Sequence, residues 1–313
     1  MDKLLAMRTF LTILERGSLT AAAAVLDTSL PTVVRTLSAL ESELGVRLLN
    51  RTTRRLALTD EGREYSERCR RILADIEDAQ NALSKRRSVP SGRVVVTAPA
   101  TFGRRHVTPL LCEYLAAQPQ VTAELLLLDR VVHLMDEGID VAVRIGQLED
   151  SALIVQHVGH VRWVVCASPK YLARRGVPAH PSELAEHACL RFVEAGVWTT
   201  WRFVLEGKVR RVDVRGALDT NHVEAALDAC VAGFGIGRFL DYQVADELAA
   251  GRLRLLLSGY ALPQVPVQVV FAHARGLSAR VRSLVDQLVP GLQRRLAELP
   301  RLQPKAAGKR TPR

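Results

Sequence analysis

Three apolar stripes at helical spacing occupy the first 44 residues, and the breaks between them limit where each helix can begin and end. Apolar residues recur every three or four positions from Leu4 to Leu14, and Gly17 stops that pattern. Ser18 is a suitable N-cap for a second, short helix over residues 19–26, whose alanines allow a crossing helix to approach closely. We therefore expect two closely packed helices before a third one begins.

The third helix is expected to follow the break at residues 27–29 and to end at Gly45. Thr28 or Ser29 can cap it, and Pro31 falls in its first turn, where a missing N–H costs nothing. The positions predicted to face inward are Val33, Leu37, Leu40 and Leu44. Those predicted to face outward include Thr32, Arg35, Thr36 and Ser38. A short helix, a tight turn and a longer helix form a helix-turn-helix.

Residues 46–58 read as two short β-like pieces around a polar turn, with four arginines and no acid. Read alone, such a segment is a solvated loop. Directly after a helix-turn-helix it is a wing, because fixed cations beside a recognition helix bind phosphates while the groove contacts discriminate between sequences. The residues expected to contact DNA are Ser18, Thr28, Ser29, Pro31, Thr32, Arg35, Thr36, Arg51, Thr52, Arg54 and Arg55.

Residues 17–62 resemble the N-terminal signature of the LysR-type family of transcriptional regulators. The matching positions are Ala22, Ala23, Arg35, Leu40, Glu41, Leu44, Gly45, Leu48, Arg51, Leu58, Thr59 and Gly62. The resemblance implies a sequence-specific DNA-binding regulator whose promoter binding is modulated by a small-molecule effector. Leu30 and Val34 depart from the pattern, since the family often has glutamine and serine there. Apolar side chains can touch a thymine methyl but cannot hydrogen-bond to a base, so we expect an unusual operator.

A helix capped by Thr59 is expected next, as a linker over residues 59–88. Its apolar positions lie close to a 3.5-residue repeat and are Tyr65, Cys69, Ile72, Ile76, Ala79 and Leu83. The alternative is an ordinary amphipathic helix covered by another domain, but few single domains cover about 45 Å of helix. We predict a homodimer through this helix, and the resemblance adds that family members often assemble as tetramers.

Strands and helices alternate after a hinge at residues 84–92, which indicates a parallel sheet. Residues 140–146 and 166–172 resemble the family's element at the effector cleft and the start of its second subdomain. The expected fold is an N-terminal all-α winged helix-turn-helix with a long linker helix, followed by a C-terminal α/β periplasmic-binding-protein-like (type 2) domain of two subdomains. The expected parts are 1–58, 59–88, 89–300 (subdomain one 93–162 plus 266–297, subdomain two 163–265) and a basic disordered tail at 301–313.

The effector is expected at the carboxyl ends of strands and at helix starts, because ligands of open α/β sheets bind there. The candidate residues are Pro99, Ala100, Thr101, Leu128, Asp129, Arg144, Gly146, Trp201 and Asn221. Backbone N–H groups at Thr101 and Asn221, with the charge of Arg144, favour a small organic anion. For each residue a structural role is the alternative, and for Trp201 core packing is favoured over a place in the wall of the cleft.

Motifs of common enzyme classes are absent from the sequence. No GxSxG, HExxH or P-loop string occurs, and the glycines of residues 233–237 follow a helix instead of opening one. The spacing of cysteine and histidine does not match a zinc site. We expect no enzyme, no metal and no cofactor. The net charge of +10 fits double-stranded DNA as a partner.

Two other functions stay open at this stage. A small-molecule-binding protein without DNA activity would explain the α/β domain but not the first 58 residues. A cysteine-based redox-sensing regulator would require Cys189 and Cys230 to approach each other, whereas reduced core thiols are the default for five scattered cysteines. The charged N-terminus is unlike a signal peptide and no apolar run could span a membrane, so a cytoplasmic location is expected.

Overall fold

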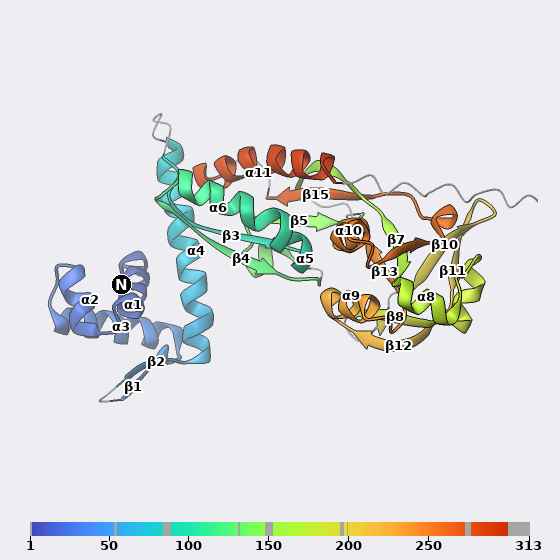
Figure 1. Cartoon of the computed structure of the whole chain (residues 1–313). Coiled ribbons are helices and arrows are strands. Elements are labelled where there is room, and N and C mark those ends of the chain that lie inside the picture. The colour runs from blue at the N-terminus through green and yellow to red at the C-terminus, as the bar shows by residue number, and fades with distance from the viewer. Residues whose placement is uncertain are drawn as a thin grey trace, which may run out of the picture. The chain divides into compact units, whose positions relative to one another are not determined.

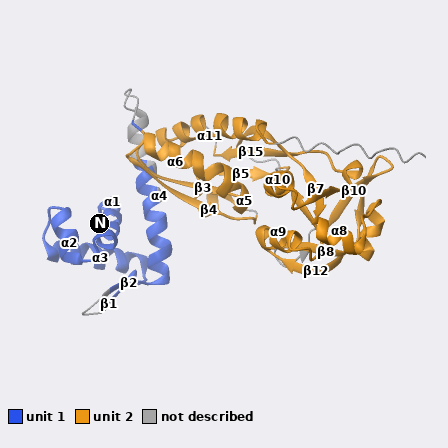
Figure 2. Ribbon diagram, in the orientation of Figure 1, with its two compact units in different colours: residues 1–89 blue, residues 90–313 orange. Residues whose placement is uncertain are grey.

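The computed structural model describes residues 2–52, 55–83, 89–130, 132–147, 153–194, 197–198, 200–272 and 277–299. The chain forms two compact units, Met1–Val89 and Pro90–Arg313 (Figure 2). Each unit has hydrophobic core clusters of its own. None of the described helices is long and apolar enough to cross a membrane.

The first unit consists of three helices, a hairpin and a long helix (Figure 1). The elements are α1 (Lys3–Arg16), α2 (Leu19–Val25), α3 (Leu30–Leu44), β1 (Leu49–Thr52), β2 (Arg55–Leu58) and α4 (Asp60–Leu83). The hydroxyls of Ser18 and Ser29 accept hydrogen bonds from backbone N–H groups in the first turns of α2 and α3. Gly17 and Gly45 end α1 and α3 in the left-handed conformation. These caps confirm the predicted helix limits.

The core of the first unit joins α1, α2, α3 and the start of the hairpin. Val33, Leu37 and Leu40 are buried, as the sequence predicts. Leu44 was expected in the same stripe, but 38% of its surface is exposed. It is the last residue of α3, and the chain turns at Gly45 before any element can cover it.

The hairpin is fixed to its neighbours by polar contacts. One carboxylate oxygen of Glu41 accepts from the backbone N–H groups of Leu48 and Leu49, at 2.9 and 3.2 Å. The Thr59 hydroxyl donates to the Arg47 carbonyl and accepts from the Gly62 N–H. A Cβ at Gly62 would lie 2.0 Å from the Leu48 carbonyl oxygen, so only glycine fits there. These contacts explain why residues 41, 59 and 62 belong to the sequence signature.

The beginning of α4 packs within its own chain, which corrects the predicted dimer stripe. Cys69 and Leu73 are buried in the core of the first unit, and the Tyr65 ring lies 5.9 Å from the Phe10 ring. By contrast, 40% of the Ile72 surface is exposed. The side chains of Ala79 and Leu83 lie outside the described part of the chain. Tyr65 and Cys69 therefore serve the internal core and are not free for a partner helix.

The second unit contains two mixed sheets and a separate hairpin (Figure 1). The first sheet has the order β4-β3-β5-β15-β6, with β3 parallel to β4 and β5 but β15 antiparallel to β5 and β6. Its strands are β3 (Gly92–Ala98), β4 (Val121–Leu127), β5 (Val141–Ile145), β6 (Ile154–Val161) and β15 (Val265–Phe271). Its helices are α5 (Ala100–Phe102), η1 (Gly103–Val107), α6 (Thr108–Ala117), α7 (Leu134–Glu137) and α11 (Ala279–Ala297).

The second sheet has the order β12-β8-β13-β7-β14, with β9 paired to β8. Here β8 runs parallel to β12 and β13, whereas β7 runs antiparallel to β13 and β14. The elements are β7 (Trp163–Ala167), α8 (Pro169–Arg175), η2 (Pro181–Glu186), β8 (Ala188–Glu194), β9 (Val197–Trp198), β12 (Arg215–Thr220), α9 (Val223–Val231), β13 (Ile236–Leu240), α10 (Asp241–Ala249), β14 (Arg254–Leu256) and η3 (Ser258–Tyr260). The separate hairpin is β10 (Trp201–Leu205) with β11 (Lys208–Val212). Alternation in the sequence indicated parallel strands, but both sheets are mixed.

The chain passes between the two sheets twice. Arg162 separates β6 from β7, and residues 257–264 connect β14 to β15. Tyr242 of α10 packs in the core of the first sheet, where its ring meets Phe102 edge-on at 5.2 Å. The Arg105 guanidinium also donates to the Tyr242 carbonyl. The start of α10 is thus shared between the two sheets.

Candidate DNA-binding surface and effector site

The beginning of α3 presents a short row of polar and apolar groups on the surface of the first unit. The hydroxyls of Ser29 and Thr32 lie 2.9 Å apart and share a hydrogen bond. Pro31 and Arg35 are exposed, and Thr36 is half-buried. Within the described part of the chain, Arg35 forms no ion pair, so its guanidinium is available to an external anion.

The two positions that depart from the family pattern lie on the same helix. Leu30 exposes 40% of its surface, and Val34 is half-buried. The structure therefore places an apolar side chain beside Pro31 at the exposed start of α3. Such a group suits contact with a thymine methyl better than hydrogen bonding to a base.

Two of the predicted DNA contacts have structural roles inside the first unit. The half-buried Ser18 hydroxyl caps α2, and the Thr28 N–H donates to the Ala23 carbonyl at 3.0 Å. Arg51, Thr52 and Arg55 belong to the hairpin β1-β2, in which Thr52 pairs with Arg55. Arg54 lies outside the described residues.

The predicted effector residues at the ends of β3 and β4 come together, but they satisfy one another. The Ala100 N–H donates to the Asp129 carboxylate at 2.9 Å, and the Pro99 carbonyl accepts from Gly103 at 2.7 Å. The N–H of Leu128 is bonded to the Ala98 carbonyl, and Thr101 is buried. The start of α5 already holds a carboxylate from its own chain, which contradicts the expectation of N–H groups open to an anion.

The start of α9 has no side-chain cap, but an acid stands in its first turn. Asn221 is exposed, but the next N–H, of His222, donates to the Thr220 hydroxyl at 3.1 Å. Glu224, in the first turn of α9, forms an ion pair with Arg104 from the first sheet. An acid at this position repels an anionic ligand, so the preference for anions cannot rest on α9.

Trp201 does not line an open wall. Only 2% of its surface is exposed, and it belongs to the core of the second sheet with Phe203 and Ile236. It lies on β10, which pairs with β11. The structure thus shows core packing, the role that the sequence favoured for Trp201.

Arg144 is the predicted effector residue whose environment most favours an anion. Its Nη2 atom is buried and has no hydrogen-bond partner among the described residues. Burial lowers the pKa of Arg144. The Glu137 carboxylate is held by two hydrogen bonds from Arg130, which lower the pKa of Glu137. The charge of Glu137 opposes the lowering of the Arg144 pKa. No described carboxylate forms an ion pair with Arg144, however, so its Nη2 atom is left for a further acceptor.

Gln268 and Gly146 lie close to Arg144, the first on the paired strand β15 and the second two residues along the chain. Gln268 on β15 lies opposite Arg144 on β5, and its Oε1 atom is likewise buried without a partner in the described part of the molecule. Gly146 has φ of 129°, and its N–H donates to the Pro266 carbonyl. The unpaired donor and acceptor on neighbouring strands form a polar spot in an otherwise apolar sheet.

The cysteines do not form the pair that a redox reading requires. Cys189 and Cys230 lie in different core clusters, and burial raises the pKa of the Cys189 thiol to about 12. Cys230 instead donates to the Cys166 carbonyl at 3.4 Å. The pKa of Cys166 is raised by its contact with Cys230 and by burial. A raised pKa makes the thiols of Cys166 and Cys189 poor nucleophiles, and all three cysteines are buried core residues.

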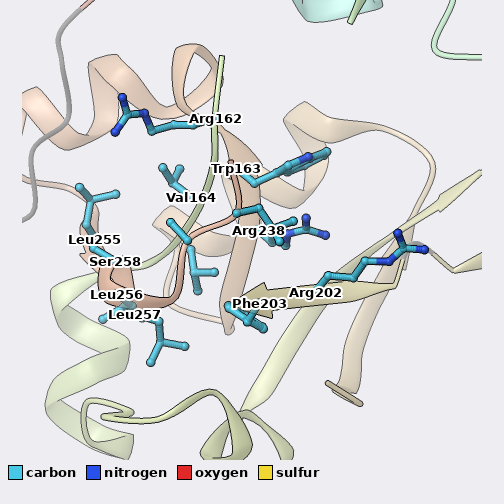
Figure 3. Close-up of a pocket in the computed structure, with 13 residues that line it drawn as sticks. Arg162, Trp163, Val164, Arg202, Phe203, Arg238, Leu255, Leu256, Leu257 and Ser258 are labelled. Carbon is cyan, nitrogen blue, oxygen red and sulfur yellow. The ribbon is translucent and has the colours of Figure 1, made fainter. Parts of the chain in front are cut away.

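A pocket that sequence reasoning missed lies on the second sheet beside β10 (Figure 3). Trp163, Arg202 and Arg238 lie on one side of it, and Leu255, Leu256 and Leu257 lie on the other. The sequence did hold one sign of this pocket, because Arg238 is a charged residue within the otherwise apolar strand Ile236–Leu240. Its proximity to Trp163 depends on strand register, which the sequence did not reveal.

Models of one protein family match both units of the chain. Residues 4–63 match the model of the bacterial regulatory helix-turn-helix protein of the lysR family, and residues 87–293 match the LysR substrate binding domain. An HTH-type transcriptional repressor of Pseudomonas aeruginosa is 34% identical over 288 residues, which cover 91% of each chain. The regulator CrgA of Neisseria meningitidis is 32% identical over 284 residues, or 90% of this chain and 95% of CrgA.

Solved structures give the same result. The structure of CrgA from Neisseria meningitidis aligns with a TM-score of 0.60 and 31% identity, covering 92% of this chain and 98% of that one. The full-length Vibrio cholerae virulence activator AphB aligns with a TM-score of 0.61 at 26% identity and the same coverage. A helix-turn-helix joined by a linker helix to an α/β effector domain defines a ligand-responsive transcriptional regulator. The chain belongs to the LysR-type family of these DNA-binding regulators, which are not enzymes.

Proposed function

We propose that this regulator binds its operator as a dimer and that a small organic anion, bound near Arg144, modulates the binding. The observation that carries the anion is the buried Nη2 atom of Arg144, which no described residue satisfies. Leaving a charged donor buried and unpaired costs stability, and a carboxylate would remove that cost. Gln268 can add a polar contact from the neighbouring strand.

The proposed DNA contacts come from the start of α3 and from the wing. Arg35 and Thr32 would read the major groove, and Leu30 would contact a thymine methyl. The wing arginines Arg51, Arg54 and Arg55 would bind phosphates and so govern affinity more than sequence preference. Ser18 and Thr28 are proposed only as backbone-positioning residues, because their groups are engaged in capping and in the turn.

The proposed link between the two functions is the pair of chain crossings in the second unit. A ligand shifts an equilibrium only through different affinities for its two states. Both β5 and β15 belong to the first sheet, and β15 directly follows the second crossing. An anion bound there would favour the arrangement of the two sheets in which the second sheet also contacts it. The resulting change would reach DNA through the linker helix as a change in affinity or in DNA bending.

The test is calorimetric titration of the full chain with small polar acids, such as succinate and citrate, with wild type compared with Arg144→Gln. We expect an acid that binds wild type to lose about tenfold or more in affinity, because a charge-assisted hydrogen bond is removed. Arg282→Gln, on the exposed face of α11, is the matched control and should bind as wild type does. Equal affinity for Arg144→Gln would refute the assignment, and binding of neutral compounds alone would refute the anion.

A further inference from the structure

We propose that the second unit has an additional binding site, in the pocket at Arg238, for a small carboxylate that carries an apolar group. This pocket lies on the second sheet, whereas Arg144 belongs to the first. The inference does not depend on the proposed role of Arg144, since the two arginines stand on different strands, β13 and β5.

The charge of Arg238 is the first observation. Its guanidinium donates to the Thr200 carbonyl at 3.0 Å and stacks over the Trp163 ring, with 4.3 Å from Cζ to the ring centroid. Neither contact supplies a negative charge, and no described carboxylate forms an ion pair with it. Burial and the charge of Arg202 lower the pKa of Arg238 to about 10. A desolvated cation next to a second cation is stabilised by an anion.

Arg162, at the edge of the same pocket, shows the contrast. Its guanidinium lies 3.7 Å from the Asp241 carboxylate and so has an acid within its own chain. Arg202 is exposed and adds positive charge at the rim. Arg162 and Arg238 are both half-buried, but of these two arginines of the pocket only Arg238 has no described acid as an ion-pair partner.

The walls of the pocket determine which anion fits. Phe203 and Leu256 are buried core residues, and Leu255 and Leu257 continue the apolar surface. The hollow comprises about 510 Å³, including its open mouth. One cationic end beside aromatic and aliphatic walls selects a ligand with a carboxylate at one end and an apolar body at the other. A small inorganic anion would leave the apolar walls uncovered.

The pocket also lies at both crossings between the sheets. Arg162 and Trp163 follow β6, while Leu257 and Leu262 belong to the segment that leads to β15. Leu257 has φ of 52°, in the left-handed region that is unfavourable for leucine. A ligand in contact with both crossings can therefore bias the arrangement of the two sheets, in addition to any effect at Arg144.

The experiment titrates the full chain with benzoate and 4-methylpentanoate, and with benzamide as the uncharged analogue. Calorimetry and tryptophan fluorescence report binding, because Trp163 lines the pocket. We expect saturable binding of the acids, weakened about tenfold or more by Arg238→Gln, and much weaker binding of benzamide. Arg210→Gln, on the exposed hairpin strand β11, should retain wild-type affinity.

Arg202→Gln keeps the test decisive even where Arg238→Gln does not fold. Arg202 is exposed, so its loss should leave the fold intact and weaken benzoate binding about threefold at low salt. The proposal is overturned if neither acid binds, if benzamide binds as tightly as benzoate, or if both Arg238→Gln and Arg202→Gln bind benzoate like wild type. Loss of benzoate binding in Arg144→Gln alone would assign the ligand to the first sheet instead.

Discussion

The two units of this regulator use arginine in opposite ways. In the first unit, Arg35 is exposed on α3, while nearby acids are engaged internally: Glu41 caps the hairpin and Glu43 pairs with Lys3 at 2.8 Å. In the second unit, Arg144 and Arg238 are largely buried, and no described carboxylate forms an ion pair with either. Exposed cations suit a polyanion such as DNA, and salt screens that interaction. Cations with little access to water suit one small anion that replaces their lost hydration.

This difference separates affinity from selectivity. A surface arginine loses little solvation when it meets a phosphate, and it releases counterions from the DNA. A buried arginine has already lost solvation on folding, so a ligand that fits recovers part of that cost and one that does not fit gains nothing. The comparison therefore assigns general DNA affinity to the first unit and ligand selectivity to the second.

A dimer would present the arginines of two first units to DNA, so we test whether the linker helix α4 holds two chains together. We predict that Ile72→Glu with Ile76→Glu abolishes the dimer, because both glutamates would bury a charge in the seam. Sedimentation should then show half the wild-type mass. Arg68→Glu, exposed on the same helix, should leave the mass unchanged. An unchanged mass for the double variant would place the dimer contact elsewhere.

His106 shows what burial does to an ionisable group of the second unit that has no described hydrogen-bond partner. His106 is 9% exposed, and its Nε2 atom has no partner among the described residues. It faces Phe102 and Tyr242. Burial, then the charges of Arg295 and Arg105, lower its pKa to about 4. The folded second unit thus holds a neutral histidine among aromatic rings.

Stability should consequently fall in acid. Between about pH 6.5 and pH 4 the unfolded chain binds a proton that folded His106 does not, so stability rises with pH across this window and is complete above it. The shift corresponds to roughly 3 kcal/mol at most. His106→Leu should reduce the difference in melting temperature between pH 7.5 and pH 5, and His157→Gln, an exposed control, should not. An unchanged difference in His106→Leu would show that another group titrates.

The helix limits of the first unit could be predicted because they depend on residues close together in the sequence. Ser18, Gly17 and Gly45 act on backbone groups within a few residues, so their effect can be recognised from the sequence. The same holds for Pro31 in the first turn of α3. The apolar stripe on α4 led to a wrong prediction for Tyr65 and Cys69. The same spacing is expected whether these residues pack against α1 or against a second chain.

Contacts between distant segments escaped the sequence analysis. Nothing local to Asp129 indicates that its carboxylate caps Ala100, and nothing local to Glu224 indicates its ion pair with Arg104. Both depend on how loops from different strands meet. The stacking of Arg238 on Trp163 likewise requires the antiparallel register of β13 and β7. The starts of α5 and α9 were therefore predicted to favour an anion, although Asp129 already accepts from the start of α5 and Glu224 stands in the first turn of α9.

We claim that arginines of α3 and of the wing bind the polyanion, whereas Arg144 and Arg238 of the second unit do not. The most direct measurement is the affinity of the full chain for non-specific duplex DNA across a salt series, which needs neither operator nor effector. For Arg54→Ala with Arg55→Ala, the slope of log affinity against log salt should become shallower by about 0.9 for each lost phosphate contact. For Arg144→Gln with Arg238→Gln, the slope should equal that of wild type. An unchanged slope in the first pair, or a shallower slope in the second, would contradict the claim.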